Sequence, residues 1–300
     1  MSPSSSKAGV ESVGAPRAGA KARDVLALTK PRISVLSVAT AAAGLALAPG
    51  GASAKLATLT LLGTLLLVGS ASTLNMYLER DVDAKMARTK NRPLPAGRLS
   101  ASLALWFGLA QAAVAIPMLW LGANALTGAL GALALVLYVL VYTPLKRKTT
   151  ISLLIGAIPG AMPPLLGWTA ATNHVSVAAL AVFGVMFFWQ IPHFIAIALF
   201  RTEDYVGAGL KILPAEVGEV AARKQLFAYL IAQIVVTLAL VPLGLGGKVY
   251  LAGAVLLGAW MLVLGLRGLR ADADVPWAKK FFLATVAYLP ALLCLLVVAR

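Results

Sequence analysis

The sequence has few charged residues. Asp, Glu, Lys and Arg make up 12% of its 300 residues, roughly half of the ~25% that is usual in a soluble domain. Hydrophobic residues make up 60%. A soluble domain of this composition would expose too much apolar surface to water, so we expect a protein that folds in the bilayer.

Cysteine and several familiar motifs are also nearly or wholly absent. Cys294 is the single cysteine, which excludes an internal disulfide and a cysteine-based metal site. It stands in an apolar run, where we expect a small hydrophobic side chain. No GxGxxG motif, P-loop or Ser–His–Asp pattern occurs, which argues against the nucleotide-binding and hydrolase classes that depend on them.

The first 24 residues contain no long apolar run, so we predict no secretory signal. They are rich in Ser, Ala, Gly, Pro and basic residues, and we predict a disordered cytoplasmic tail over 1–24. Acids are scarce there, as in a transit peptide, but proline and glycine disfavour the amphipathic helix of such a peptide. We therefore favour a bacterial cytoplasmic (inner) membrane over a mitochondrial inner membrane.

The rest of the chain is a series of apolar stretches, each near the ~20 residues that a membrane helix needs. They fall at about 32–49, 56–78, 101–121, 125–143, 152–170, 176–199, 224–243, 248–266 and 281–299. We predict an all-α, multi-pass membrane domain of nine transmembrane helices over residues 25–300.

Charge is divided unevenly between the two ends of these spans. The tail and the loops after spans 2, 4, 6 and 8 hold 23 of the 26 Lys and Arg residues, and the other three are Lys55, Lys248 and Arg300. The positive-inside rule therefore places the N-terminus in the cytoplasm. All 11 acids fall on the same side. An ion-coupled carrier usually has carboxylates near the membrane midplane, so this distribution disfavours that class.

The end of span 2 contains a stripe of oxygen-bearing side chains. Asn75, Glu79 and Asp83 are spaced four residues apart, so on a continuing helix they share one face, from which Asp81 points away. One amide and two carboxylates suit Mg²⁺, which prefers oxygen ligands and often shares a phosphate. Bases follow at Lys85, Arg88, Lys90 and Arg92. We predict a metal–diphosphate site here, because a solvated loop alone does not explain the clustered acids.

The end of span 6 contains Trp189, Gln190 and His193, which are polar or amphipathic groups inside an apolar run. Two readings of His193 stay open. It is either a core histidine bonded to a neighbouring helix or a group lining an acceptor pocket, as a haem ligand or in proton transfer.

The loop after span 6 repeats the order of acids followed by a base. Glu203 and Asp204 precede Lys211. If this loop faces the first stripe, its two acids could hold a second metal. The alternative is a hydrated loop.

These segments together resemble a known family. The residues concerned are Thr29–Arg32, Asn75–Pro93, Tyr142-Thr143 with Lys146-Arg147, Trp189–Phe194, and Asp204-Tyr205 with Gly209 and Leu213-Pro214. Over roughly residues 25–300 the chain is similar to the UbiA superfamily of intramembrane prenyltransferases. The Trp-Gln-x-Pro-His-Phe run resembles the branch of that superfamily that farnesylates haem.

The resemblance implies a nine-helix fold around a central cavity and Mg²⁺-dependent transfer of farnesyl from farnesyl diphosphate to a vinyl group of haem b. Asn75, Glu79 and Asp83 would then bind the metal–diphosphate, and His193 would act on the acceptor. The implied diphosphate donors are Arg88, Lys90, Arg92, Lys146, Arg147 and Lys211. Tyr142, Trp189 and Gln190 complete the implied substrate-binding set. Enzymes of haem A synthesis or terminal-oxidase assembly are candidate partners, and nucleic acid is not.

The chain departs from the superfamily pattern at two places. Glu79 stands where the superfamily has Asp. The second signature, Asp-x-x-x-Asp, falls on Arg201 and Tyr205, which leaves Glu203 and Asp204 as the only acids there. Two other functions stay open, a prenyltransferase acting on a quinone-precursor aromatic and a transporter of an amphiphile.

Overall fold

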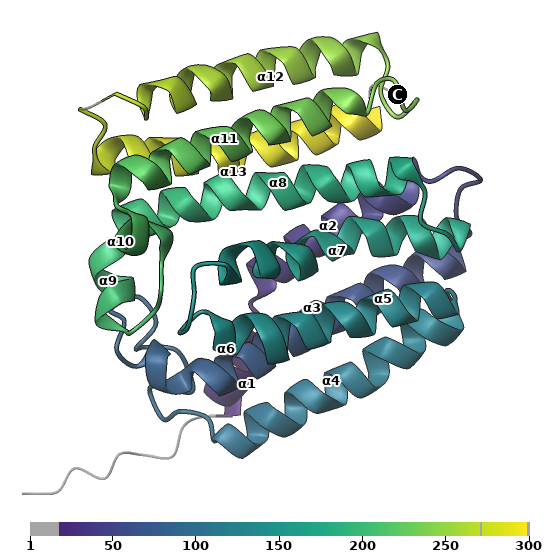
Figure 1. Cartoon of the computed structure of the whole chain (residues 1–300). Coiled ribbons are helices and arrows are strands. Elements are labelled where there is room, and N and C mark those ends of the chain that lie inside the picture. Colours follow the sequence, from purple (N-terminus) through teal and green to yellow (C-terminus); the bar gives the residue numbers. More distant parts are fainter. Residues whose placement is uncertain (1–17, 271, 299–300) are drawn as a thin grey trace, which may run out of the picture.

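The computed structural model describes residues 18–270 and 272–298, and every regular element in that part of the chain is a helix. The long helices run side by side in one bundle (Figure 1). They are α2 (Pro31–Leu47), α3 (Ala54–Asp83), α4 (Ala101–Gly122), α5 (Ala125–Val136), α7 (Ser152–Thr172), α8 (Val177–Phe200), α11 (Glu219–Ala239), α12 (Lys248–Arg267) and α13 (Val275–Val298). α5 continues through a π-helix, η1 (Leu137–Tyr142), into a last short turn, α6 (Thr143–Leu145).

The number of membrane spans agrees with the prediction from hydropathy. Within the described residues, eight helices are long and apolar enough to cross a membrane, counting α5 to α6 as one. A ninth is reached if Lys21–Leu28 and Pro31–Leu47, which meet at 45°, form one broken span. The predicted all-helical membrane fold is therefore confirmed.

Several helix ends differ from the apolar runs that predicted them. α1 (Ala18–Leu28) begins inside the segment predicted to be a disordered tail, and residues 1–17 lie outside the described part. α11 begins at Glu219 and α13 at Val275, each several residues before the apolar run. Hydropathy ends a predicted span at its first charges, whereas a helix continues through charged residues with adequate helix propensity.

The outer surface of the bundle is apolar. Leu121, Leu256 and Val298 are 83%, 72% and 85% exposed. Such side chains would aggregate in water, but they are ordinary where lipid tails surround the helices.

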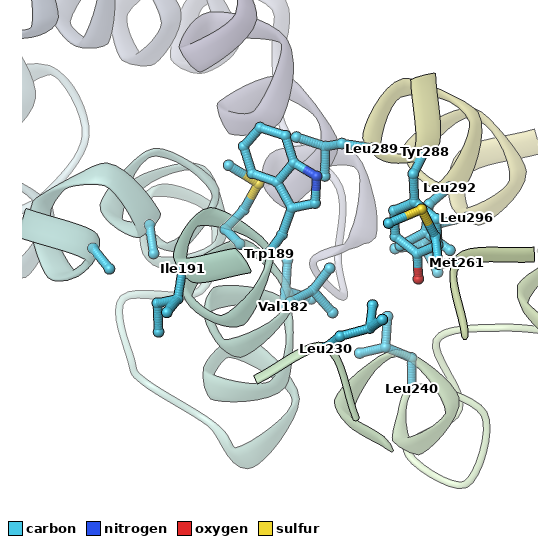
Figure 2. Close-up of a cluster of buried hydrophobic side chains, with 14 of the residues drawn as sticks. Val182, Trp189, Ile191, Leu230, Leu240, Met261, Tyr288, Leu289, Leu292 and Leu296 are labelled. Atoms are coloured by element: carbon cyan, nitrogen blue, oxygen red, sulfur yellow. The ribbon is translucent and has the colours of Figure 1, made fainter. Parts of the chain in front are cut away.

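The interior packs tightly between α8, α11, α12 and α13. This core includes Val182 and Trp189 of α8, Leu230 of α11 and Tyr288 and Leu292 of α13 (Figure 2). Tyr288 and Leu292 are fully buried. The packing fixes α13 against the face of α8 that bears Trp189.

α2 and α7 approach each other at glycines. A Cβ added at Gly44 would collide with the backbone of Pro164, and a Cβ added at Gly167 would collide with the backbone carbonyl of Ala41. Small residues allow membrane helices to pack backbone against backbone. This contact sets the position of α2, whose first turn borders the site described below.

Two short helices, α9 (Thr202–Gly207) and α10 (Leu213–Val217), lie at one end of the bundle (Figure 1). α13 ends at the opposite end of the bundle. The loop between α3 and α4 lies at the same end as α9. It is bonded to α1, because the Arg98 guanidinium donates two hydrogen bonds to the Asp24 carboxylate, at 2.9 and 3.0 Å. These bonds raise the pKa of Arg98. This end of the bundle is the one that the charge distribution predicts to be cytoplasmic.

Candidate active site

A cavity of about 680 Å³ opens among α2, α3, η1, α7, α8 and α9. Its volume is in the range of small-molecule sites. The lining is polar around the last turns of α3 and the loops beyond it. It becomes apolar and aromatic along α8, with contributions from Met186 and Trp189, and from Phe282 of α13. We call these two regions the polar end and the aromatic end.

The stripe predicted on α3 forms one wall of the polar end. Asn75, Glu79 and Asp83 all line the cavity, and they are 2%, 6% and 2% exposed. Asp81 points to solvent, with its side chain 75% exposed. Helical periodicity therefore separated the inward acids from the outward one correctly.

Each inward group has a partner in the protein. Asn75 donates to Glu79 Oε2 at 2.8 Å, and the other carboxylate oxygen of Glu79 lies 2.5 Å from Lys146 Nζ. The Asp83 carboxylate pairs with Arg92 at 2.8 Å. Buried carboxylates are costly without partners, and these ion pairs provide them.

Lys30 enters the site through an unusual backbone conformation. It sits at the break between α1 and α2 with φ 47° and ψ 65°, a left-handed geometry that costs a non-glycine residue roughly 1–2 kcal/mol. Its ammonium donates to Asn75 Oδ1 at 3.0 Å. Strained residues of this kind concentrate at functional sites.

The π-helix η1 forms another wall of the site. Thr143, just after η1, donates its hydroxyl to the Tyr138 carbonyl at 2.8 Å and accepts from the Asn75 amide at 3.1 Å. Tyr138 and Tyr142 line the cavity. Single π-helical turns occur often at functional sites, because the extra residue redirects the side chains around it.

Positive charge exceeds negative charge along the cavity. The basic lining residues are Lys30, Arg88, Arg92, Lys146, Arg201 and Lys211, and the acidic ones are Glu79 and Asp83. Six cations against two carboxylates leave a formal excess of four positive charges. A cavity with this excess attracts a polyanion such as a diphosphate.

The donor set fits Mg²⁺ shared with a phosphate better than a cage made of protein alone. In the described residues no group of three or more His, Cys, Asp and Glu side chains could hold a metal ion. Mg²⁺ commonly takes one or two carboxylates and completes its shell with waters and phosphate oxygens. Glu79 and Asp83, one helical turn apart with Asn75 beside them, fit that arrangement.

The segment after α8 presents different residues to the cavity from those predicted. Arg201 and Tyr205 line it, whereas Glu203 and Asp204 are not among its lining residues. The Asp204 carboxylate accepts from the backbone N–H of Ala87 at 3.0 Å, which fastens this segment to the loop after α3. The structure therefore does not bring the two acids into the cavity, and their predicted role as metal ligands stays a prediction.

The predicted basic residues also divide into two groups. Arg88, Arg92, Lys146 and Lys211 line the cavity, whereas Lys90 and Arg147 are not among its lining residues. The backbone N–H of Lys211 donates to the carbonyl of Lys146 at 2.9 Å. This bond holds the loops on either side of the polar end together.

Tyr142 and the residues predicted on α8 lie in the cavity lining. Trp189 donates its indole N–H to the Thr285 carbonyl of α13 at 2.9 Å, and Gln190 donates to the Met186 carbonyl at 3.0 Å. His193 lies seven residues before the end of α8, about 10 Å of helical rise from it. It therefore lies deeper in the bundle along α8 than Glu203 and Asp204, which follow the end of that helix.

Sequence reasoning missed several lining residues, namely Lys30, Tyr138, Arg201, Tyr205 and Phe282. Lys30 had a local signal in the Thr-Lys-Pro-Arg segment, which was too ordinary to stand alone. Arg201 and Tyr205 had a positional signal, since they occupy the places of the second acidic signature. Tyr138 and Phe282 had none, because an aromatic in an apolar run is unremarkable.

Comparison with known proteins gives a consistent result. Residues 37–286 match the UbiA prenyltransferase family. A protoheme IX farnesyltransferase of Sorangium cellulosum is 54% identical over 240 residues, covering 80% of this chain and 86% of its own. The protoheme IX farnesyltransferase of Myxococcus xanthus is 50% identical, covering 93% of this chain and 95% of its own.

Solved structures share the fold at low identity. A UbiA homolog from Aeropyrum pernix superposes with a TM-score of 0.72 at 21% identity, covering 88% of this chain and 96% of its own. A UbiA homolog from Archaeoglobus fulgidus bound to GPP and Mg²⁺ superposes with a TM-score of 0.64 at 18% identity, covering 92% of this chain and all of its own.

Proposed function

Since this chain belongs to the UbiA prenyltransferase family, we propose that it transfers a farnesyl group from farnesyl diphosphate to a vinyl group of haem b, with addition of water, to give haem O. Relatives that are 46–54% identical over most of their length are protoheme IX farnesyltransferases. The observation that carries the proposal is the two-ended cavity. A cationic end suited to diphosphate adjoins an aromatic end suited to an isoprenoid chain and a flat macrocycle.

The polar end binds the diphosphate and stabilises its departure. Lys30, Arg92 and Lys146 donate hydrogen bonds to phosphate oxygens as negative charge collects on the leaving group. Glu79 and Asp83 keep Lys146 and Arg92 in position before the substrate arrives. Cations that are already oriented need little reorganisation in the transition state.

Asn75, Glu79 and Asp83 would hold Mg²⁺, which would supply further charge neutralisation at the diphosphate. The Archaeoglobus homolog binds GPP and Mg²⁺. Arg201 and Lys211 extend the cationic lining on the side of α9, where the superfamily has its second pair of acids.

The aromatic end protects the allylic cation that remains when the carbon–oxygen bond breaks. Apolar and aromatic walls exclude bulk water and favour a delocalised cation over the face of a ring. The vinyl group of the acceptor attacks the farnesyl C1 with its electron pair and forms the new carbon–carbon bond. Water then adds to the porphyrin-side cation and loses one proton, so farnesyl diphosphate, haem b and water give haem O, diphosphate and that proton.

The orientation in the membrane follows from charge. The chain is a multi-pass membrane protein. We propose that the polar end of the cavity faces the cytoplasm of a bacterial cytoplasmic membrane, because the basic loops lie at that end and the positive-inside rule applies to them.

The test is to analyse haem extracted from membranes that contain this protein, after incubation with farnesyl diphosphate and Mg²⁺. Chromatography and mass spectrometry should detect haem that has gained one farnesyl and one water. EDTA should abolish this product, and excess Mg²⁺ should restore it. Unchanged haem, with diphosphate released only when an aromatic quinone precursor is supplied, would overturn the proposed acceptor and retain the family reaction.

Lys146 provides a sharper test of the polar end. Lys146→Met removes the cation that pairs with Glu79 and lines the cavity. A hydrogen bond to a charged group contributes about 1.5–3 kcal/mol, so we expect binding of farnesyl diphosphate to weaken by roughly 10–150-fold. Calorimetric titration measures this. Lys148→Met, at an exposed base of the same loop, is the matched control, and equal affinity in the two variants would remove Lys146 from the site.

A further inference from the structure

The imidazole of His193 is held on three sides. The Trp189 ring stacks on it with centroids 4.8 Å apart and planes at 25°. Phe282 of α13 lies with its centroid 4.9 Å away at 38°. The hydroxyl oxygen of Thr285, also on α13, lies 2.7 Å from Nδ1. The ring therefore has little freedom to rotate or tilt.

Hydrogen-bond accounting assigns the tautomer of this ring. Thr285 Oγ1 lies 2.6 Å from the Phe282 carbonyl oxygen. Two oxygens this close repel each other unless a hydrogen lies between them, and a threonine hydroxyl has one hydrogen to give. That hydrogen is used on the carbonyl, so the short contact to Nδ1 needs a hydrogen from the ring. Nδ1 is therefore protonated, and Nε2 has a free lone pair.

Nε2 is available to a ligand. His193 lines the cavity, and none of the described residues is hydrogen-bonded to Nε2. In contrast, the neighbouring Trp189 and Gln190 have their polar hydrogens bonded to carbonyls of the protein. A neutral imidazole with one nitrogen anchored and the other free is the usual arrangement of a metal-binding histidine.

We propose that His193 Nε2 is the axial ligand to the iron of the tetrapyrrole acceptor, and that Thr285 is the positioning residue that sets its tautomer and orientation. The inference rests on the proposed function, since it needs haem as the acceptor. Ligation at Nε2 fixes the height and tilt of the macrocycle against α8. It thereby holds one vinyl edge towards the polar end, where the allylic carbon is released. Trp189 is a second positioning residue. It stacks on the imidazole and donates a hydrogen bond to the Thr285 carbonyl, so it holds the imidazole in a fixed position relative to α13.

The first test uses the unaltered protein in detergent without farnesyl diphosphate. Haem b should bind more tightly than metal-free protoporphyrin IX, which has the same ring, vinyl groups and propionates but no iron. His193→Ala should remove that preference. Equal affinities for the two porphyrins in the unaltered protein would overturn axial ligation.

The second test separates positioning from packing. Thr285→Val keeps the shape of the side chain and removes the acceptor for Nδ1–H. We expect haem affinity to fall by about 10–100-fold, as is typical when the outer partner of a metal-bound histidine is lost. The iron–histidine stretching band of ferrous haem, read by resonance Raman spectroscopy, should shift to lower frequency. Thr285→Ser keeps the hydroxyl and should restore both values.

Thr237→Val is the matched control for the loss of a buried threonine hydroxyl. Thr237 lies on α11, is 1% exposed and bonds to Tyr288 rather than to the cavity. The Thr237→Val variant should leave the iron–histidine band unchanged. The positioning role is wrong if Thr285→Val and Thr237→Val give the same spectrum and affinity. Farnesylated haem formed by protein that shows no histidine band would overturn this inference alone, whereas haem that neither binds nor reacts would overturn the proposed function as well.

Discussion

The Asp83→Asn variant should lose farnesyl transfer by at least about a hundredfold, while Asp81→Asn keeps the activity of the unaltered protein. Asp83 is buried in the cavity lining and paired with Arg92. The amide has nearly the same shape but no negative charge, so it holds Arg92 and a divalent cation shared with the diphosphate much less strongly. Losing one group that stabilises transition-state charge typically costs about 10²–10³-fold in rate.

The pair of variants is informative because the two aspartates differ mainly in where their side chains point, Asp83 into the cavity and Asp81 to solvent. They are two residues apart on one helix, and the Asp81 side chain is 75% exposed where Asp83 is 2% exposed. Activity is read as farnesylated haem by mass spectrometry, and folding as the elution profile in detergent. Full turnover by a correctly folded Asp83→Asn protein would remove Asp83 from the reaction and with it the assignment of the α3 stripe.

The inward stripe of α3 could be predicted because it depends only on helical periodicity within one helix. The apolar spans could be predicted for a similar reason, since each is a local excess of hydrophobic residues. Contacts across the chain had no such local signal. Lys30 meets Asn75 across 45 residues, and His193 meets Thr285 across 92 residues. The first contact depends on how α2 packs beside α3, and the second on how α13 packs beside α8. Neither packing arrangement can be read from the sequence of one helix alone.

The lining that the segment after α8 contributes to the cavity could not be predicted from composition alone. Two adjacent acids followed by a lysine resemble the first cluster in order. Arg201, just before the short helix α9, and Tyr205 on α9 line the cavity, whereas Glu203 and Asp204 are not among its lining residues. The direction of a side chain on a helix of six residues is set by its ties to neighbours, in this case the bond from Ala87 to Asp204. A sequence pattern does not contain that tie.

The Gly167→Ala variant should be strongly destabilised. The new Cβ would lie well inside contact distance of the Ala41 carbonyl and the Leu45 N–H. These are backbone atoms of α2, so no rotamer change relieves the collision and the two helices must separate. Overpacking usually costs about 1–3 kcal/mol, and we expect the upper end of that range. Both the amount of folded protein in membranes and its melting temperature in detergent should fall.

The contact between α2 and α7 also links stability to the active site. α2 begins at Pro31, directly after the left-handed Lys30 that donates to Asn75. Moving α2 away from α7 displaces that ammonium, so the folded fraction of Gly167→Ala should also bind farnesyl diphosphate more weakly. Gly44→Ala, which meets the Pro164 backbone from the α2 side of the contact, should show the same two effects.

Gly258→Ala is the control for adding a methyl group to a transmembrane glycine. Its Cβ would lie 3.4 Å or more from the nearest atoms, which belong to the Ile234 side chain, and the helix gains a residue of better propensity. It should melt at or slightly above the temperature of the unaltered protein. A melting temperature for Gly167→Ala equal to that of Gly258→Ala would show that α2 and α7 are not in backbone contact. The position of Lys30 at the diphosphate end would then need another explanation.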